Sequence, residues 1–288
     1  MRIINGHTKL TALLGHPVSH SISPLMHNEA FEQLGINYVY LSFDAKEEEL
    51  EQTVDALKHL GARGWNCTMP DKIRMCELCD FLSPAAKLIG AVNTVVNEDG
   101  KLYGYNTDGI GYMLSIQEAG FDIIGKKVTL LGAGGAAMAI LVQAALDGVR
   151  EISLFCRHGK SWKHAEEMTA RLNEETMCHV QLFDIADKEL LKRELDTSDI
   201  VTNATNVGMS PNEDASVIED KSMFHQGMIV SDVIYSPRET KLMKLAKEAG
   251  CPTLNGLYML LYQGAEAFRL WTGKDMPVAH IKEKYFEQ

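Results

Sequence analysis

The sequence feature that most constrains the fold is a glycine-rich turn between an apolar run and a helical run. Residues 127–131 are an apolar stretch of the strand type that leads into Gly132-Ala133-Gly134-Gly135-Ala136-Ala137, and a run rich in Ala and Leu follows as far as Gly148. Gly132 permits a tight turn, Gly134 lets the backbone approach a pyrophosphate, and the helix start offers N–H groups to the anion. This order predicts a dinucleotide site, although similar turns also join strands to helices that bind no ligand.

Length and composition indicate a globular protein of about two domains. The chain has 288 residues, of which 45% are hydrophobic and 23% charged. The 28 basic and 39 acidic residues give a formal net charge of −11 without a basic block, so we expect no nucleic acid partner. No apolar run reaches the roughly 18 residues of a membrane span, and no leader-like segment opens the chain. We therefore expect a cytoplasmic protein with no membrane partner.

The cysteines and histidines predict neither a disulfide framework nor a metal site. The six cysteines are irregularly spaced, and the one close pair, Cys76 and Cys79, lies in a predicted helix without a second pair or nearby His ligands. His16, His20 and His27 also lack the spacing of metal ligands. We expect no metal.

In the first third of the chain, apolar runs of the strand type end in polar loops. Such runs cover residues 10–14, 38–43 and 65–69. Ser21 and Ser23 follow the first run, at the sheet edge where open α/β folds bind ligands, but serines before a helix are also common caps. Lys72 follows the third run in the first turn of a helix, where the helix dipole disfavours a cation, which hints at a functional role.

A predicted hairpin delivers a second polar loop. Residues 90–96 pair with residues 101–105 across a turn at 97–100. Asp108 then lies in an Asn-Thr-Asp-Gly sequence before a helical segment, where it either caps the helix or serves as an acid/base group. Asn93 either satisfies backbone groups or contacts a ligand.

The second half alternates strands and helices in the doubly wound pattern. After the glycine turn, a fold that prefers NAD usually places an acidic residue about 20 positions on, to bind the ribose 2′-hydroxyl. This chain has Arg157 there. A guanidinium suits a 2′-phosphate and favours NADP, with a solvated strand end as the alternative. Gln263, on an apolar helix over residues 257–271, is either a ligand contact or a satisfied core amide. The expected elements are strands at 151–156, 179–183, 200–203 and 228–235, and helices at 162–172, 188–195 and 239–249.

Together these residues resemble the shikimate dehydrogenase family, in particular its quinate/shikimate branch. The matching motifs run in family order over nearly the whole chain: residues 19–24 (SHSISP), 66–72 (NCTMPDK), 91–94 (AVNT), 105–109 (YNTDG), 132–136 (GAGGA) and 262–266 (YQGAE). The resemblance implies an α/β fold of two domains. An N-terminal α/β substrate domain would comprise residues 1–109, completed by 257–288, and a Rossmann-type doubly wound nucleotide-binding domain would comprise residues 110–256.

The resemblance also implies roles for individual residues. Lys72 and Asp108 correspond to the catalytic acid/base pair. The substrate-binding set is Ser21 and Ser23 for the carboxylate, Thr68, Asn93 and Gln263 for the hydroxyls, and Tyr235 as a further substrate or nicotinamide contact. The cofactor-binding set is Gly132, Ala133, Gly134, Gly135, Ala136, Arg157, Thr205, Val233 and Gly256. The chain departs from the family pattern at Cys67, where Val is common, and at 156–158, where it has Cys-Arg-His in place of Asn-Arg-Thr.

The activity implied is the reversible reduction of 3-dehydroshikimate to shikimate in aromatic amino acid biosynthesis, with the 3-dehydroquinate/quinate pair as a second substrate. NADP or NAD is the cofactor, and Arg157 favours NADP. A homodimer is one option that the sequence leaves open. The alternatives are a non-catalytic quinate or shikimate sensor on the same fold, and a two-domain dehydrogenase of the folate or malic type.

Overall fold

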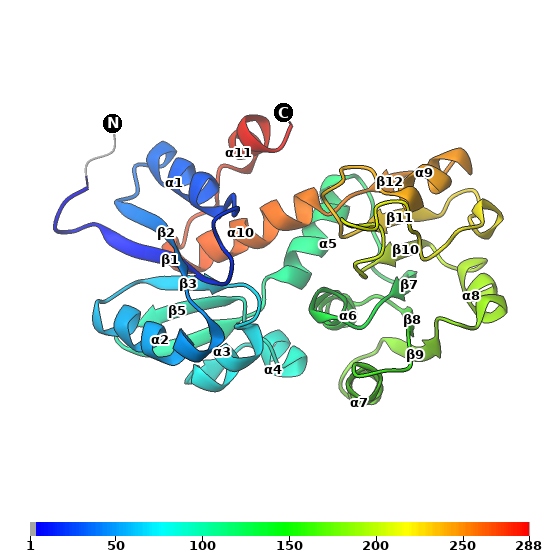
Figure 1. The fold of residues 1–288 in the computed structure, drawn as a ribbon, viewed down its shortest axis with the longest axis horizontal. Helices are drawn as coiled ribbons and strands as arrows, with labels where there is room; N and C mark the ends of the chain where they lie inside the picture. The colour runs from blue at the N-terminus through cyan, green and yellow to red at the C-terminus, as the bar shows by residue number, and fades with distance from the viewer. Residues whose placement is uncertain (1–3, 288) are drawn as a thin grey trace. The chain divides into compact units, whose positions relative to one another are not determined.

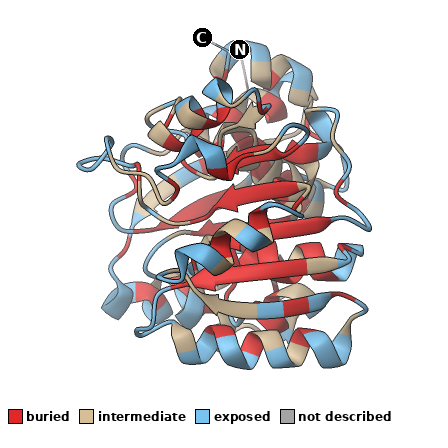
Figure 2. Ribbon diagram, turned by 90° about the vertical axis from the view of Figure 1, so that its right-hand side faces the viewer, coloured by how far each residue is buried: buried red, intermediate tan, exposed pale blue. Residues whose placement is uncertain are grey.

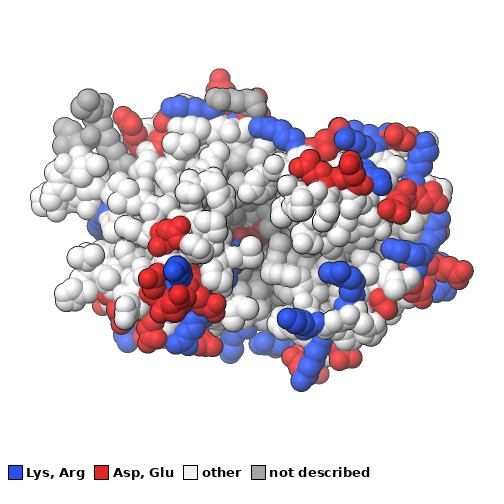
Figure 3. All heavy atoms as spheres, viewed as in Figure 1, with Lys and Arg blue, Asp and Glu red and all other residues white. Residues whose placement is uncertain are grey.

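The computed structural model describes residues 4–287 and divides into two compact units. We call Met1–Thr107 with Leu261–Gln288 unit 1, and Asp108–Leu260 unit 2. Each unit contains its own six-stranded sheet (Figure 1). Among the described residues, no helix is long and apolar enough to cross a membrane. Acidic and basic side chains are interspersed on the face drawn in Figure 3, and the formal net charge is −11.

The sheet of unit 1 is mixed, with the strand order β2-β1-β3-β5-β6-β4. Its parallel part pairs β1 with β2 and β3, and the hairpin β5-β6 adds antiparallel strands beside β3. The strands are β1 Lys9–Gly15, β2 Tyr38–Asp44, β3 Gly64–Cys67, β4 Phe81–Leu82, β5 Thr94–Glu98 and β6 Lys101–Tyr105. The α-helices are α1 Ser23–Gln33, α2 Leu50–His59, α3 Lys72–Leu78, α4 Pro84–Ile89 and α11 Val278–Tyr285, and α10 Leu257–Thr272 enters this unit at Leu261.

Two sequence predictions for unit 1 need correction. The hairpin turn is tighter than residues 97–100, because Glu98 pairs with Lys101 and only Asp99 and Gly100 lie between the strands. Both have positive φ, 49° and 83°, which is the twist that a two-residue hairpin turn requires. The apolar spacing within residues 47–60 predicts a single helix, whereas the structure has a 3-10 turn, η1 Glu47–Glu49, before α2 begins at Leu50. The short elements β4 and α4 were not predicted.

The sheet of unit 2 has the order β12-β11-β10-β7-β8-β9, and all the strand pairs are parallel. When the six strands are numbered from β7 and read from β9 to β12, this is the 3-2-1-4-5-6 order of the Rossmann fold. The doubly wound prediction is therefore confirmed. The strands are β7 Lys127–Leu131, β8 Glu151–Cys156, β9 His179–Asp184, β10 Ile200–Asn203, β11 Ile229–Asp232 and β12 Thr253–Leu254. The helices are α5 Asp108–Glu118, α6 Gly135–Asp147, α7 Trp162–Glu175, α8 Lys188–Leu195, η2 Lys221–Met223 and α9 Lys241–Glu248.

Burial of this sheet explains why its strands are so apolar. Helices α5, α6 and α7 lie on one side and α8 and α9 on the other (Figure 1). All residues of β7, β10 and β11 are buried, whereas the helices expose their outer faces (Figure 2). A sheet covered on both faces needs continuous apolar runs rather than alternation. The predicted strand 228–235 is too long, because the Asp232 carboxylate accepts a hydrogen bond from the Ile234 N–H at 3.0 Å and the chain turns there.

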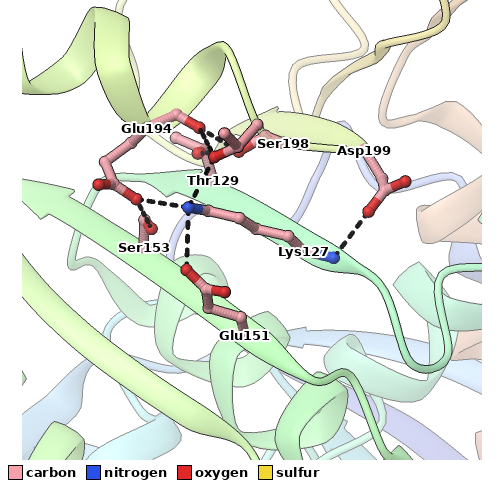
Figure 4. A network of polar contacts seen from close by, with 8 residues as sticks. Lys127, Thr129, Glu151, Ser153, Glu194, Ser198 and Asp199 are labelled. Atoms are coloured by element: carbon pink, nitrogen blue, oxygen red, sulfur yellow. Dashed lines mark hydrogen bonds and ion pairs between the residues drawn. The ribbon is translucent and has the colours of Figure 1, made fainter.

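A buried ionic cluster lies at the amino edge of the same sheet (Figure 4). The Lys127 ammonium, on the first residue of β7, lies 2.7 Å from Glu194, 2.9 Å from Glu151 and 2.9 Å from the Thr197 hydroxyl. Ser153 donates to Glu194 at 2.7 Å. We call these five residues the Lys127 network. Burial alone would lower the pKa of Lys127, but hydrogen bonds to Glu194 and Glu151 reverse the effect and raise it.

Candidate functional site

The glycine turn of unit 2 has the geometry of a phosphate-binding turn. Gly132 has a φ of 113°, and a Cβ there would lie 2.8 Å from the Ala204 carbonyl oxygen, so this position requires glycine. A Cβ on Gly134 or Gly135, in contrast, would meet no heavy atom within 4 Å. The turn therefore borders open space at the start of α6. The N-cap residue of this helix is Gly134, which has no side chain to cap it. This is the place at which a Rossmann fold binds pyrophosphate.

Three more predicted cofactor residues lie beside this turn, at the carboxyl edge of the sheet. The Cβ position of Gly132 is 3.0 Å from the Thr205 methyl carbon. The Val233 N–H donates to the Asn203 carbonyl at 2.9 Å, and a Cβ on Gly256 would lie 1.8 Å from the Val233 oxygen. Unit 2 thus brings Gly132, Thr205, Val233 and Gly256 together.

Two residues that the sequence reasoning missed hold these loops in place. Asn203 accepts hydrogen bonds from the Thr205 N–H and hydroxyl, at 3.1 and 2.7 Å, and donates to Asp232 at 3.1 Å. The Asp232 carboxylate also accepts from the Thr240 hydroxyl at 2.8 Å. Burial raises the pKa of Asp232 to about 6, against the opposing effect of these hydrogen bonds. The sequence signal that could have identified Asn203 and Asp232 is that each is a polar residue at the end of a buried strand.

Arg157 and Tyr235 also follow strands of unit 2 but stay exposed. Arg157 begins the loop after β8, and Tyr235, with 46% of its surface exposed, lies on the loop after β11. Because both strands are parallel to β7, both loops lie at the carboxyl edge of the sheet. Asp108 starts helix α5 in the same unit.

In unit 1, Ser23 is joined to Asn93 by buried hydrogen bonds. The Tyr40 hydroxyl, fully buried, is hydrogen-bonded to the Ser23 side chain and donates to Asn66 at 2.8 Å. Asn66 donates to the Thr94 hydroxyl at 2.9 Å, and Thr94 donates to Asn93 at 3.0 Å. Burial raises the pKa of Tyr40 well above its usual value, so the phenol stays neutral.

The chain of contacts continues to the residue that precedes Asp108. The Asn93 amide donates to the Thr107 hydroxyl at 3.0 Å, and the Thr107 N–H donates to Asn93 at 2.8 Å. We call Ser23, Tyr40, Asn66, Thr94, Asn93 and Thr107 the Tyr40 network. The sequence analysis predicted Ser23 and Asn93 as site residues but missed the other four members. Tyr40, for example, lies within a strand, where a tyrosine is typical of a core.

Ser21 has a structural role in addition to any role in binding. Its hydroxyl accepts a hydrogen bond from the Ser23 N–H at 3.2 Å, at the entry to α1. The helix begins at Ser23, with Pro24 in its first turn. Ser21 therefore makes the kind of backbone contact that the capping alternative describes. Ser23, in contrast, belongs to the Tyr40 network.

Backbone contacts fix Thr68 and Lys72 close to Asn93 and the end of β1. The Thr68 N–H donates to the Leu14 carbonyl at 2.9 Å, and the Lys72 carbonyl accepts from the Val92 N–H at 2.8 Å. Lys72 is the first residue of α3. Its neighbour Asp71 is fully buried, and neither of its carboxylate oxygens has a hydrogen-bond partner among the described residues. Burial is the main cause that raises the pKa of Asp71 to about 6.

Gln263 is half-buried on α10, where this helix approaches α1. A Cβ on the next residue, Gly264, would lie 2.2 Å from the methyl carbon of Met26, so α10 and α1 pack closely there. His27 beside it is fully buried and stacks on Tyr40 at 4.5 Å between ring centroids. Burial lowers the pKa of His27 to about 3, so the ring is neutral.

The described cysteines are all free, and the described residues contain no group of three or more His, Cys, Asp or Glu side chains placed to hold a metal ion. Cys79 follows the last residue of α3 rather than lying within it.

Sequence comparisons agree with the geometry of both units. A family model described as the shikimate dehydrogenase substrate binding domain matches residues 13–95, and one described as the shikimate 5′-dehydrogenase C-terminal domain matches residues 256–284. A shikimate dehydrogenase (NADP(+)) of Listeria monocytogenes serotype 4b is 53% identical over 283 residues, which cover 98% of this chain and 97% of the relative. The chain belongs to the shikimate dehydrogenase family.

Other family members share the fold and differ in the cofactor they hold. A quinate/shikimate dehydrogenase of Escherichia coli O17:K52:H18 is 46% identical over 96% of both chains. The crystal structure of Listeria monocytogenes shikimate 5-dehydrogenase with shikimate and NAD superposes with a TM-score of 0.95 over 97% of both chains, at 53% identity. The Thermus thermophilus enzyme with NADP(H) and shikimate has a TM-score of 0.81 at 32% identity, covering 96% of this chain and 98% of that one. The predicted family and two-domain α/β fold are confirmed.

Proposed function

We propose that this protein is an NAD(P)-dependent shikimate dehydrogenase, which reversibly reduces 3-dehydroshikimate to shikimate, with 3-dehydroquinate and quinate as a second substrate pair. The observation that carries the proposal is the glycine turn that borders open space beside Thr205 and Val233, in a chain 53% identical to a relative of that name. We assign substrate binding to residues 1–109 with 257–288, and cofactor binding to residues 110–256.

In the cofactor domain, Gly132, Ala133, Gly134, Gly135 and Ala136 would bind the pyrophosphate, and Arg157 the adenosine end. Thr205, Val233 and Gly256 would contact the rest of the dinucleotide. A bound nicotinamide supplies or accepts the hydride. Support comes from the open space at Gly134 and Gly135 and from the hydrogen bonds that fix Thr205 and Val233.

The substrate domain would supply the proton and hold the ring. Lys72, as the ammonium, donates a proton to the C3 carbonyl oxygen as the hydride arrives, and Asp108 orients it. In the reverse reaction the neutral amine accepts that proton. Ser21 and Ser23 bind the substrate carboxylate, and Thr68, Asn93 and Gln263 bind hydroxyls, so that C3 is oriented for transfer. Tyr235 adds a contact to substrate or nicotinamide. The buried hydrogen bonds of Ser23 and Asn93 support preorganised side chains at these positions.

The direct test follows reduced nicotinamide by absorbance with shikimate or quinate and with NAD or NADP, in four parallel reactions. We expect turnover with shikimate and at least one cofactor. Binding of shikimate, measured by calorimetry, without turnover in any reaction would favour the sensor on the same fold. No interaction with shikimate or quinate at all would favour a dehydrogenase of the folate or malic type.

A cytoplasmic location and the homodimer option stay predictions. Cell fractionation with an antibody to the chain tests the first, and light scattering coupled to size-exclusion chromatography tests the second.

A further inference from the structure

The loop after β8 carries a histidine that is held from two sides. The ring of His158 stacks on Trp162, the first residue of α7, with 3.7 Å between ring centroids and 21° between the planes. Its Nε2 lies 3.7 Å from an oxygen of Asp184. The loop itself is closed by a hydrogen bond from the Trp162 N–H to the Gly159 carbonyl at 3.1 Å.

Asp184 is fixed on the neighbouring strand. It ends β9 and pairs in register with Cys156, the last residue of β8. One carboxylate oxygen accepts from the Ala186 N–H at 2.9 Å, and the other faces His158. The Ile185 N–H also donates to the Cys156 carbonyl at 3.0 Å. The carboxylate therefore stands beside the loop and cannot turn away without losing a backbone contact.

These groups surround the position at which a Rossmann fold distinguishes NAD from NADP. The end of the second strand contacts the ribose 2′ position of the adenosine. Arg157 and His158 are exposed directly after that strand, and His158 keeps 63% of its side chain accessible. A 2′-phosphate brings a charge of about −1.5 to −2, which attracts Arg157, accepts from a ring N–H of His158 and repels Asp184. A 2′-hydroxyl, in contrast, can donate to a carboxylate.

We propose that His158 and Asp184 together set the choice between NAD and NADP, with His158 binding the 2′-phosphate and Asp184 opposing it. The inference rests on the proposed cofactor site of unit 2. In this arrangement His158 has two competing partners. It contacts Asp184 when the ribose carries a 2′-hydroxyl, and it contacts the phosphate when the ribose carries a 2′-phosphate. Trp162 keeps the ring at the loop in both cases. His158 and Asp184 are thus two cofactor-site residues that the family resemblance did not indicate.

A contribution to folding stability does not explain why His158 and Asp184 lie together. An exposed ion pair contributes little to stability, and both side chains are more than one third accessible. Variants at either position should therefore fold, which thermal melting checks, and a change in cofactor preference would then report recognition.

The experiment compares wild type, Asp184→Asn and His158→Ala with two probes, adenosine 2′,5′-bisphosphate and adenosine 5′-monophosphate, by calorimetry. We expect Asp184→Asn to raise the affinity for the bisphosphate about tenfold, since a like charge is removed. We expect His158→Ala to lower it about tenfold. The monophosphate affinity should change less than twofold in both. The ratio of kcat/KM for NADP to that for NAD should move in the same directions.

The control is Asp196→Asn, which makes the same change in net charge at an exposed residue paired with Lys192 at 2.5 Å. We expect its probe ratio to equal that of wild type. An unchanged ratio in both test variants, or an equal change for both probes, overturns the proposal while leaving shikimate turnover intact. A wild-type protein that binds neither probe overturns the cofactor site itself. Binding with the expected shifts but no shikimate turnover would overturn the proposed reaction alone.

Discussion

The two units bury their polar groups in different chemical forms. The Tyr40 network of unit 1 consists of neutral hydroxyls and amides, whereas the Lys127 network of unit 2 is built around one ammonium and two carboxylates. The first includes proposed site residues and joins the carboxyl end of β3 to the start of β5 and the end of β6. The second lies at the amino ends of β7 and β8, away from the glycine turn that follows β7.

This difference separates function from stability. A neutral network is satisfied over a wide range of pH and holds side chains in one orientation, which suits groups that must bind a substrate. A buried ion pair is destabilising when only one partner is removed, because the other charge stays buried without compensation. We therefore expect changes at the carboxyl edges to alter catalysis and cofactor choice, and changes at the amino edge of unit 2 to alter stability.

The largest effect should come from the lysine at the carboxyl edge. Lys72→Ala removes the proposed proton donor, and we expect kcat to fall about 10³-fold, within the range for loss of a general acid. The affinity for NADP, measured by calorimetry, should stay within twofold of wild type. Lys87→Ala, an exposed lysine of α4, is the control and should keep full activity. Full turnover by the Lys72 variant would refute the assignment.

The lysine at the amino edge should show the opposite response. Lys127→Met leaves the partly buried carboxylates of Glu151 and Glu194 without the buried ammonium, and we expect a loss of about 3 kcal/mol in the free energy of unfolding. Urea denaturation measures this value, and kcat of the folded fraction should be close to wild type. Lys126→Met is the matched control, since Lys126 is half-exposed and lies 3.7 Å from Asp199. Equal destabilisation by both variants would contradict the distinction between the two edges.

Two buried aspartates sharpen the comparison further. Asp232 accepts three hydrogen bonds, whereas neither oxygen of Asp71 has a hydrogen-bond partner within residues 4–287, yet burial raises the pKa of both to about 6. A raised pKa means that the folded state holds the proton more tightly than the unfolded state does. Stability therefore falls as the pH rises from about 4 to about 6, and the loss persists above that window.

For Asp71, replacement by Asn should remove this loss. The pKa change from 3.8 to about 6 corresponds to roughly 3 kcal/mol. Asp71→Asn should thus be more stable than wild type at pH values above about 6 and equal to it below about 4. Denaturation curves at both ends of this range measure the difference. A variant that is less stable at neutral pH would show that the carboxylate has a partner in solution.

The sequence predicted those features that depend on neighbours along the chain. Apolar runs, the glycine turn and the alternation of strands and helices are local patterns, and they predicted the doubly wound fold of unit 2 and the motifs of the family. The polar networks are not local. Lys127 on β7 and Glu194 on α8 are 67 residues apart. Tyr40 on β2 and Asn66 on β3 are 26 apart, and the sequence pattern does not specify how these elements pack. Lys127 alone reads as a polar strand entry, and Asn203 and Asp232 as ordinary strand ends.

The smallest expected effect tests whether the Tyr40 network orients substrate or only supports the fold. Tyr40→Phe keeps the aromatic stack on His27 but removes the hydroxyl between Ser23 and Asn66, so both lose a partner. We expect a loss of about 1 kcal/mol in stability and a KM for shikimate raised about fivefold, with the KM for the cofactor unchanged. Tyr38→Phe is the control, because the Tyr38 hydroxyl makes only a 3.4 Å contact to the Trp271 carbonyl, outside the network. A role confined to folding would lower stability and leave both KM values at wild type, whereas a rise in the shikimate KM alone would assign this neutral network to substrate orientation.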